Sequence, residues 1–381
     1  MEKRKPRLLF VGAFTLGADG LTGGTLAACR QLMDSPLTSI FDVTTIDVSQ
    51  PDARSRTLAH RTISGAARLL RVCALVITRR VDVAMIFATV GTSWIERGLM
   101  ALVCQLFGVQ SFLLPRCSEV VGDIEEKSSM RAFTRLLVKS GTRFVFQGQP
   151  LKKRFLAVFP QAASHVDVLS NWIDLGWRDS VSPLPTSEPV NILYMGWLHP
   201  YKGVDILIEG LARNAVQFGN CRFVLCGDGS ERAMLEAAAA QTGLDIEFRG
   251  WVHGEAKAKA FSDAQIVILP SRVEGMPNVL LEAMSAGRPV VATKVGDVAS
   301  LVDDGVEGFL VEPLDPDAFV AALLKLVQDP AMRARFGAAG RAKIERDHDL
   351  GKAWRKLADL LGAAPDTNAS AAQPSQLTAA K

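Results

Sequence analysis

The chain has little of what would point to a disulfide-bonded, metal-binding or membrane-spanning protein. Its 381 residues include six cysteines, with no C-x-x-C pair and no metal-ligand spacing among them (Cys29, Cys73, Cys104, Cys117, Cys221 and Cys226). This usage favours a reducing compartment over a disulfide scaffold. No apolar run approaches the ~20 residues that a membrane-spanning helix needs. We therefore expect a cytoplasmic protein that attaches, at most, peripherally to the inner face of a membrane.

The first twenty residues admit two interpretations. MEKRKPRLLFVGAFTLGADG has a basic head and a short apolar stretch, as a signal peptide would. It also fits a buried first strand, Leu8–Ala13, that enters a glycine-rich loop, because strands of parallel sheets appear as continuous apolar runs. No small-x-small cleavage pattern closes the stretch cleanly, and we predict the strand.

Composition indicates a soluble globular protein, with 48% hydrophobic and 22% charged residues, and the length favours two domains. The net charge of +3 is unevenly spread. Residues 1–180 hold 23 Lys and Arg against 15 Asp and Glu, which gives +8, and residues 181–381 hold 20 against 25, which gives −5. The basic groups, such as Arg68 with Arg71 and Arg79 with Arg80, are either solvated helix faces or a surface that meets an anionic partner.

Strand-like apolar runs alternate with helical patterns along the chain, which predicts an α/β architecture with parallel sheets. Before a proline-rich linker, VSPLPTSEP, the runs are RLLFVGAF, FDVTTIDV, VDVAMIFAT, QSFLLPR, TRFVFQG and HVDVLSN. After the linker they are VNILYMG, CRFVLCG, IEFRG, AQIVILP, PVVAT and GFLVE. Two sheets joined by one linker is the simplest interpretation.

These patterns define the expected domains. We expect an N-terminal domain over 1–180, a linker over 181–189 and a C-terminal domain over 190–348. An amphipathic helix is predicted over 349–362, with Trp354, Leu357 and Leu361 on one face. The remaining residues, 363–381, are small and polar without periodicity and are expected to be disordered.

The stretch SRVEGMPNVLLEAMSAG (271–287) carries the clearest functional pattern. IVILP before it is a predicted strand, so SRVEG is the loop at the strand's carboxyl end, where α/β sheets bind ligands. A helix is predicted to begin at MPN, with Pro277 in its first turn. The first amides of that helix (Asn278, Val279 and Leu280) would then be unpaired at its N-terminus, where the helix dipole also favours an anion.

Two acids flank the proline, Glu274 in the loop and Glu282 within an apolar part of the predicted helix. Carboxylates would repel phosphates, but they accept hydrogen bonds from vicinal hydroxyls. Glu282 would lie ~8 Å along the helix axis from Pro277, a distance that fits a ribose diol on the far side of a diphosphate. We interpret the stretch as a site for sugar, phosphates and ribose, in that order. The alternative, a capped helix with two solvated acids, leaves the apolar surroundings of Glu282 unexplained.

Several motifs, in order, resemble the C-terminal domain of the retaining GT-B glycosyltransferases of glycosyltransferase family four. They are GWLHPYKGVDILIEG, CGDGSE, FRGWVHGEAKAKAFSDAQIVILPSRVEGMPNVLLEAMSAGRPVVAT and VEGFLVEPLDPDAF. Glu274 and Glu282 match the two acids of the family's E-x7-E signature. The resemblance covers residues 190–345 closely, whereas over 1–180 only the loop FVGAFTLGADGLTGGT aligns in kind. It implies a GT-B fold, in which two Rossmann-like domains face a central cleft and a C-terminal helix crosses back to the N-terminal domain. It also implies that the N-terminal domain binds the acceptor and the C-terminal domain binds the nucleotide-sugar.

The resemblance also implies roles for individual residues. Lys202 matches the lysine that holds the donor diphosphate, and Gly23 and Gly24 match an N-domain loop whose backbone approaches the phosphates. The turn over Arg249–Val252 matches the segment that meets the nucleobase, largely through backbone atoms. The implied donor-binding residues are Gly23, Gly24, Gly196, Lys202, Arg249, Val252, Glu274, Gly275, Met276, Asn278, Val279, Leu280 and Glu282.

The sequence departs from the family in two places. Trp197 stands where the family usually has the arginine of G-R-x-x-x-x-K-G, so Lys202 would carry more of the diphosphate charge, together with Arg272 or His199. Many members also place a histidine after the fourth or fifth strand of the N-terminal domain, and FLLPRCSE stands there in this chain. Arg116 is our candidate for that position. The expected catalytic set is therefore Lys202, Glu274 and Arg116.

The implied reaction moves a sugar, with retention, from a nucleotide-sugar donor to a glycan or lipid-linked acceptor in cell-surface polysaccharide or glycolipid synthesis. The family precedent is a same-face attack in which the leaving phosphate acts as base. A nucleotide-sugar epimerase or hydrolase on the same fold, and a catalytically silent nucleotide-sugar-binding protein, are the alternative classes.

Two other motifs imitate cofactor sites. GDGSERA (227–233) resembles a dinucleotide fingerprint, but the strand before it is not the first of its domain. DPD (315–317) resembles a metal-binding D-x-D, but Asp315 followed by Pro316 is typical of a helix N-cap with proline at the first helical position. We therefore expect no metal, no other cofactor and no nucleic-acid partner.

Overall fold

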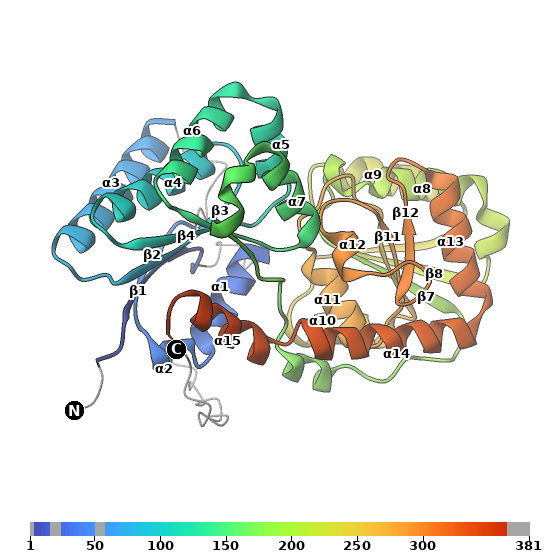
Figure 1. Ribbon diagram of the computed structural model, residues 1–381. Helices are drawn as coiled ribbons and strands as arrows, with labels where there is room; N and C mark the ends of the chain where they lie inside the picture. The colour runs from blue at the N-terminus through green and yellow to red at the C-terminus, as the bar shows by residue number, and fades with distance from the viewer. Residues whose placement is uncertain (1–3, 16–23, 50–57, 364–381) are drawn as a thin grey trace. The chain divides into compact units, whose positions relative to one another are not determined.

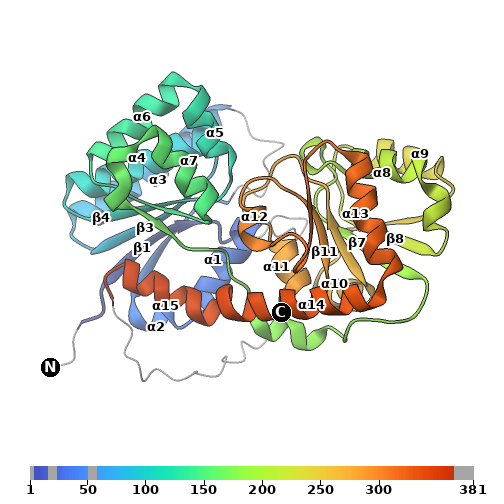
Figure 2. The same cartoon turned by 45° about the vertical axis from the view of Figure 1, so that its right-hand side comes forward.

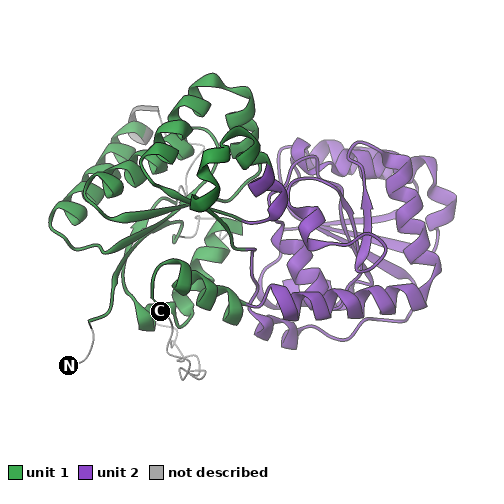
Figure 3. Cartoon of the chain, in the orientation of Figure 1, with its two compact units in different colours: residues 1–146, 154–169, 350–381 green, residues 147–153, 170–349 purple. Residues whose placement is uncertain are grey.

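Two compact units make up the chain, of which the computed structural model describes residues 4–15, 24–49 and 58–363 (Figure 3). Unit 1 contains the described residues up to Phe146, the segment Arg154–Leu169 and the segment from Leu350 onward. Unit 2 contains Gln147–Lys153 and Ser170–Asp349. Each unit has its own parallel sheet.

A six-stranded parallel sheet in the order β2-β1-β3-β4-β5-β6 forms the centre of unit 1 (Figure 1). Its strands are β1 (Arg7–Gly12), β2 (Asp42–Asp47), β3 (Val83–Ala88), β4 (Gln110–Pro115), β5 (Arg143–Phe146) and β6 (Val166–Val168). The residues from Leu8 to Val11 are fully buried, which confirms the predicted first strand. Because β1 is flanked by β2 on one side and β3 on the other, the strand order changes direction between β1 and β3.

Helices cover both faces of this sheet. Figures 1 and 2 show α3 (Leu58–Ile77), α4 (Thr92–Leu106) and α6 (Ser128–Lys139) on one face and α1 (Gly24–Asp34), α2 (Leu37–Ile40) and α15 (Leu350–Leu360) on the other. The remaining helices are α5 (Glu119–Glu126), which follows β4, and α7 (Gln149–Val158), which has residues in both units. None of the helices in the described part of the chain combines the length and the apolar character that a membrane span requires.

The C-terminal helix belongs to the N-terminal unit, as predicted. α15 contacts α2, and its side chains Trp354 and Leu357 are buried, with Leu361 buried just beyond its end. The residues of the predicted disordered tail after Ala363 lie outside the described part of the chain.

Unit 2 is built around a second six-stranded parallel sheet, in the order β12-β11-β10-β7-β8-β9. Its strands are β7 (Val190–Met195), β8 (Cys221–Cys226), β9 (Asp245–Gly250), β10 (Ile266–Leu269), β11 (Val290–Thr293) and β12 (Gly308–Val311). Each strand-like run predicted on either side of the linker forms a strand. These strands can be recognised in the sequence because central parallel strands are buried on both faces and therefore appear as continuous apolar runs.

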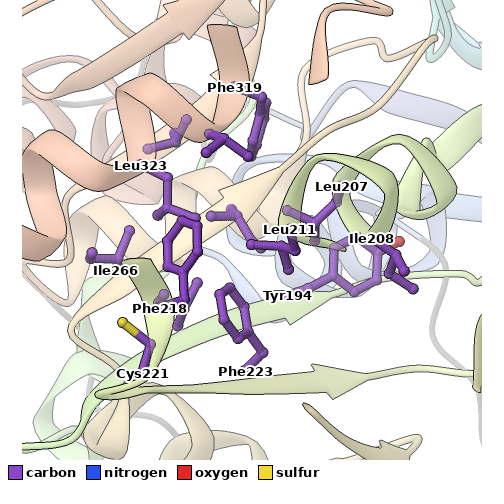
Figure 4. Packing of buried hydrophobic residues seen from close by; sticks show 14 of the residues in the cluster. Tyr194, Leu207, Ile208, Leu211, Phe218, Cys221, Phe223, Ile266, Phe319 and Leu323 are labelled. Carbon is purple, nitrogen blue, oxygen red and sulfur yellow. The ribbon is translucent and has the colours of Figure 1, made fainter. Parts of the chain in front are cut away.

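Alternate side chains of these strands enter two different cores. Ile192, Phe223 and Ile268 pack with α8 (Val204–Arg213), α9 (Arg232–Ala240) and α13 (Pro316–Gln328), a cluster shown in part in Figure 4. Leu193 and Val267 point to the opposite face and pack with α10 (Gly254–Asp263) and α11 (Asn278–Ser285). The last helices are α12 (Val298–Leu301) and α14 (Pro330–Asp347), and α14 contacts α11.

The compact units differ from the predicted domain ranges at two segments. Residues 170–180 lie in unit 2, where the indole Nε1 of Trp177 donates a hydrogen bond of 2.9 Å to Ser285 Oγ. Residues 147–153 also lie there, and the amide of Leu151 donates to the Asp297 carboxylate. The predicted linker packs on the same unit, because buried Arg288 donates to the carbonyl oxygen of Ser182.

The loop that ends at Gly203 is held closely against the end of β10. Gly203 has φ +66°, and a Cβ added there would lie 2.1 Å from the carbonyl oxygen of Pro270. We predict that Gly203→Ala lowers the free energy of unfolding by more than the roughly 1–2 kcal/mol of left-handed backbone strain, because the loop must also move away from Pro270. Urea denaturation measures the loss.

Gly243→Ala is the matched control for this prediction. Gly243 has φ +71°, and no described atom lies within 4 Å of a Cβ added to it. This variant should therefore show the backbone strain alone. Equal losses in the two variants would contradict a role for the close approach to Pro270.

Candidate functional site

Two loops of unit 2 meet where the strand order changes direction. β7 and β10 are neighbours in the sheet, but the chain continues from β7 to β8 on one side and from β10 to β11 on the other. The carboxyl ends of such a strand pair are where open α/β sheets bind ligands. The loop after β10 is joined to the loop after β7 by a backbone hydrogen bond of 2.8 Å from the Arg272 amide to the Tyr201 carbonyl.

This junction brings together Lys202 and Glu274, two of the three predicted catalytic residues. Lys202 Nζ lies 2.6 Å from Glu274 Oε1, and Ser271 Oγ donates to the same oxygen at 2.7 Å. The Glu274 side chain is 8% exposed and that of Lys202 is 16% exposed. The cation and the acid therefore neutralise each other in a largely buried position, where the lysine side chain is the more exposed of the two.

Arg272, which was expected to help Lys202 with the diphosphate charge, forms an ion pair with a different acid. Its guanidinium forms a two-pronged contact with Asp205, at 2.8 and 2.6 Å, and also donates to the carbonyl oxygen of Pro200. The hydrogen bond to Asp205 raises the pKa of Arg272. Arg272 thus ties the β10 loop to the first turn of α8, and it positions the loop that carries Lys202.

The helix after the Glu274 loop begins one residue later than predicted. Pro277 is the N-cap, with an extended backbone (ψ 124°), and α11 starts at Asn278. The Leu280 amide is not available to an anion as expected, because it donates to the Pro277 carbonyl at 3.2 Å. The Asn278 side chain accepts a hydrogen bond of 3.1 Å from Asn171 Nδ2. The Leu280 amide therefore drops out of the predicted anion site at this helix end.

Glu282 has a cation partner that the sequence did not reveal. Lys257 of α10 places its Nζ 2.6 Å from Glu282 Oε1, and the ammonium also lies 5.7 Å from the centroid of the Trp177 ring. The two side chains are 18% and 30% exposed, for Glu282 and Lys257 respectively. The spacing of Lys257 and Lys259 in GEAKAKAF does not show which lysine faces α11, and Lys259 instead pairs with Asp263 on its own helix.

The turn expected near the nucleobase, Arg249–Val252, contacts Trp197 through an aromatic ring pair. Trp197 is 37% exposed, and its ring meets that of Trp251 edge-on, with centroids 4.7 Å apart. The Arg249 guanidinium forms two hydrogen bonds with Glu247, at 2.9 and 3.0 Å, which raise the pKa of Arg249. Its side chain is thus occupied within β9, and the expectation that this turn acts through its backbone stays a prediction.

The other predicted donor-binding residues of unit 2 hold the loops in place. The Gly196 amide donates to Cys226 O at 3.0 Å, and the Gly275 carbonyl accepts from Asp297 N at 2.9 Å. Met276 is buried, and its carbonyl accepts from Asn171 Nδ2 at 2.8 Å. Val252 packs against the core beneath α11 together with Val279. These contacts fix the backbone on either side of Lys202 and Glu274.

Unit 1 contains Gly24 and Arg116 among the described residues that were predicted to belong to the site. Gly24 begins α1, and Gly23 lies outside the described residues. Arg116 follows β4, and its guanidinium lies over the Phe87 ring at 4.8 Å from the centroid. Burial lowers the pKa of Arg116 to about 10, so the side chain keeps its positive charge at neutral pH.

The described part of the chain has no candidate metal site. Within residues 4–15, 24–49 and 58–363, no group of three or more His, Cys, Asp and Glu side chains is arranged to hold a metal ion. Asp315, part of the DPD motif, is the N-cap of α13 and accepts a hydrogen bond of 2.9 Å from the Ala318 amide. The prediction of an N-cap followed by proline is confirmed.

Comparison with known proteins finds a family similarity within unit 2. Residues 189–329 match the family model for glycosyl transferases group 1. An uncharacterized glycosyltransferase of Methanocaldococcus jannaschii is 27% identical over 247 residues, which is 61% of this chain and 63% of that protein. The alpha-D-kanosaminyltransferase of Streptomyces kanamyceticus is 32% identical over 171 residues, 44% of each protein. The chain thus spans 63% and 44% of the lengths of these relatives.

Solved structures show the same fold over nearly the whole chain. Sucrose-phosphate synthase from Thermosynechococcus elongatus superposes with a TM-score of 0.73 at 18% identity, over 94% of this chain and 98% of that one. The Anabaena protein HepE in complex with UDP-glucose gives a TM-score of 0.67 at 18% identity, over 93% and 99%. The chain therefore has the GT-B fold, and its residues 189–329 are similar to the glycosyl transferases group 1 family.

The burial of the two lysine–glutamate pairs predicts how strongly each is coupled. We expect a double-mutant cycle of Lys202→Met and Glu274→Gln to give a coupling free energy of roughly 2–3 kcal/mol, because both groups are largely removed from water. The cycle of Lys257→Met and Glu282→Gln should give about 1 kcal/mol or less, since these groups are more exposed. Urea denaturation of the seven proteins, which are the unaltered chain, four single variants and two double variants, measures both. Equal coupling in the two cycles would contradict the assignment of Lys202–Glu274 as the buried pair.

Proposed function

We propose that this GT-B protein, whose residues 189–329 are similar to the glycosyl transferases group 1 family, is a retaining glycosyltransferase. It moves a sugar from a nucleotide-sugar donor to a glycan or lipid-linked acceptor, in the synthesis of a cell-surface polysaccharide or glycolipid. The observation that carries the proposal is the Lys202–Glu274 pair at the carboxyl ends of β7 and β10. The structural neighbour in complex with UDP-glucose supports a nucleotide-sugar donor.

The charges at this junction suit a sugar attached to a diphosphate. As the sugar–phosphate bond breaks, negative charge grows on the leaving diphosphate, and the Lys202 ammonium and the N-terminal end of α11 stabilise it. Without donor, the Glu274 carboxylate holds that ammonium at 2.6 Å. In the proposed complex the diphosphate takes over the ammonium, and Glu274 accepts hydrogen bonds from hydroxyls of the sugar. Glu282 lies about one helical turn after the first residue of α11 and accepts hydrogen bonds from the ribose diol.

The proposed reaction needs no nucleophile from the protein. The acceptor hydroxyl bonds to the anomeric carbon on the face from which the diphosphate leaves, and an oxygen of that diphosphate takes the hydroxyl proton. This course is the family precedent, and it produces retention. Arg116, which carries its charge at neutral pH, is proposed to stand in for the family's N-domain histidine near the sugar. No metal has a part in the proposal.

The function is tested by a donor screen followed by a transfer assay. UDP-, GDP- and ADP-sugars are screened by thermal shift, and the product formed with the stabilising donor is analysed by NMR for its anomeric configuration. We expect retention, and we expect activity to survive EDTA. Turnover without acceptor would indicate the epimerase or hydrolase, and stabilisation without turnover would indicate a silent binding protein. Activity that EDTA abolishes and Mn²⁺ or Mg²⁺ restores would overturn metal independence.

The two acids are predicted to act on different parts of the donor. Glu282→Ala should weaken the binding of free nucleoside diphosphate, because its partner is the ribose, at a cost of about 1–3 kcal/mol for each hydrogen bond left unmade. Glu274→Ala should spare that binding but reduce turnover, because its partner is the transferred sugar. Calorimetry with the nucleoside diphosphate and steady-state kinetics separate the two effects. An equal loss of affinity in both variants would refute the division of roles.

Because Trp197 replaces the family's arginine with an uncharged side chain, Lys202 is expected to be the main cation of its loop. Lys202→Ala should therefore reduce kcat/KM by an amount equivalent to ~3–4 kcal/mol of transition-state stabilisation, and Lys202→Met should be no better, since it restores length without charge. Trp197→Arg, which restores the family residue, should keep or raise the activity. Nearly full activity in Lys202→Ala would mean that another cation neutralises the phosphates.

We also propose that unit 1 attaches peripherally to anionic membranes through α3. Ile63, Leu70 and Ile77 are 69%, 68% and 59% exposed and recur every seventh residue, so they follow one side of the helix. Exposed Arg71 and Arg80 supply charges for anionic lipids. An apolar helix face beside arginines is the pattern of an interfacial helix.

Leu70→Glu is predicted to reduce co-sedimentation with phosphatidylglycerol vesicles, because it places a charge of the wrong sign in the apolar face. Val216→Glu is the control, since Val216 is 98% exposed in unit 2 and lies far from α3 in sequence. Binding of the unaltered protein should fall as salt rises. Unchanged sedimentation of Leu70→Glu, or binding indifferent to salt, would exclude this surface.

A further inference from the structure

Unit 1 has a cavity of its own at the carboxyl ends of β1 and β3. The cavity has a volume of about 720 Å³ and is lined by residues of α3 and α4. Ala13, which follows β1, and Thr89, which follows β3, line its base. The strand order of this sheet changes direction between these two strands, so the cavity occupies the position where α/β sheets take ligands. Its volume suits a small organic molecule.

Most of the cavity wall is apolar. Leu69 of α3 and Phe87 of β3 line it, together with Val90, Ile95 and Leu99 from the start of α4 and the turn before it. The last three side chains are 38%, 42% and 39% exposed. A ligand with a hydrocarbon part would cover these side chains and remove them from water. The apolar wall therefore favours a molecule that is largely hydrocarbon.

Three charged side chains also line the cavity, and their charges do not sum to zero. Arg68 Nε donates to Glu96 Oε1 at 2.8 Å, and Arg97 NH1 donates to Glu96 Oε2 at 3.0 Å. One carboxylate thus serves two guanidinium groups, which leaves one positive charge in excess. Arginine recognises phosphate through its fixed fork of donors.

Arg97 is the most deeply buried of these three charged side chains. The residue is 5% exposed, and its Nε is buried without a hydrogen-bond partner among the described residues. Burial lowers the pKa of the Arg97 guanidinium, which reflects the cost of holding its charge away from water. A buried cation with an unmet donor is stabilised when an anion enters beside it.

We propose that this cavity binds a hydrocarbon chain that ends in a phosphate group, with the phosphate at Arg97 and Arg68 and the chain along Leu69, Ile95 and Leu99. The assignment of this ligand as the carrier of the sugar acceptor rests on the proposed function, whereas its binding does not. An acceptor linked to a lipid through phosphate has the required chemistry.

The test is the binding of n-octyl phosphate to the full chain, measured by calorimetry below the micelle concentration and without donor. We expect it to bind at least tenfold more tightly than octan-1-ol or inorganic phosphate. Arg97→Met should weaken binding by roughly tenfold or more, since a hydrogen-bonded charge is lost. Arg135→Met, at an exposed position of α6 that does not line the cavity, is the control and should leave binding unchanged. Glu96→Gln should strengthen binding, because it removes the acid that competes for both guanidinium groups.

A second variant keeps the proposal testable if Arg97→Met does not fold. Ala66 lines the cavity on exposed α3, so Ala66→Trp should fill the cavity and abolish octyl phosphate binding without removing a charge. Binding no tighter than that of octan-1-ol, or binding unchanged in both variants, would overturn the proposal. Binding to anionic vesicles with no affinity for soluble octyl phosphate would also overturn it, in favour of membrane attachment alone. Because no donor or turnover enters the measurement, its failure leaves the proposed transfer reaction untouched, and a failed donor screen leaves this cavity untouched.

Discussion

The ion pair between Lys202 and Glu274 is the contact around which unit 2 arranges its candidate site. It joins the loops that leave two adjacent strands, and it does so with the acid only 8% exposed. Around it, the backbone hydrogen bond from Arg272 to Tyr201 and the fork from Arg272 to Asp205 hold the same two loops together. An isolated carboxylate in that position would be costly. The lysine therefore stabilises the buried carboxylate, and it is the group that we propose an incoming anion recruits.

The surrounding fold explains why this pair stays in place. The central strands of unit 2 are buried on both faces, so their ends are fixed, and the loops begin from rigid positions. α11 is packed into one core through Leu280, Leu281 and Met284, which leaves Glu282 at the edge of that core beside Lys257. Each acid of the E-x7-E pattern is thus balanced by a lysine from another element. The two pairs together carry no net charge. In the proposed complex a diphosphate takes the ammonium of Lys202, and hydroxyls of the donor hydrogen-bond to the carboxylates of Glu274 and Glu282.

Much of the architecture could be predicted from the sequence, and the reasons are physical. Buried parallel strands appear as continuous apolar runs, and each predicted run is a strand. The helix with Trp354 and Leu357 was predicted because its apolar residues recur at helical spacing, and it packs in unit 1 as the family resemblance implied. The nearness of Lys202 and Glu274 followed from that resemblance, whereas their direct bond did not. The roles of the site residues stay predictions.

What the sequence could not reveal depends on contacts between distant residues. Pro277 is compatible with either the N-cap or the first helical position, and only its extended ψ distinguishes them. Lys257 and Lys259 are two residues apart on a helix, and only the packing of α10 shows that Lys257 faces Glu282. The unit boundary differs from the prediction because Trp177 reaches Ser285 across 108 positions. The cavity lined by Arg97 could not be predicted from the sequence, because Arg68 and Arg97 belong to two helices that only the fold brings together.

A crystal structure of the chain with a nucleoside diphosphate tests the central claim most directly, because it shows whether the Lys202–Glu274 pair opens to receive the ligand. The account predicts a phosphate oxygen within hydrogen-bond distance of Lys202 Nζ, the ribose hydroxyls at the Glu282 carboxylate, and the phosphates beside the amides at positions 278 and 279. A diphosphate bound elsewhere, with the Lys202–Glu274 bond unchanged and Glu282 still held only by Lys257, would contradict it.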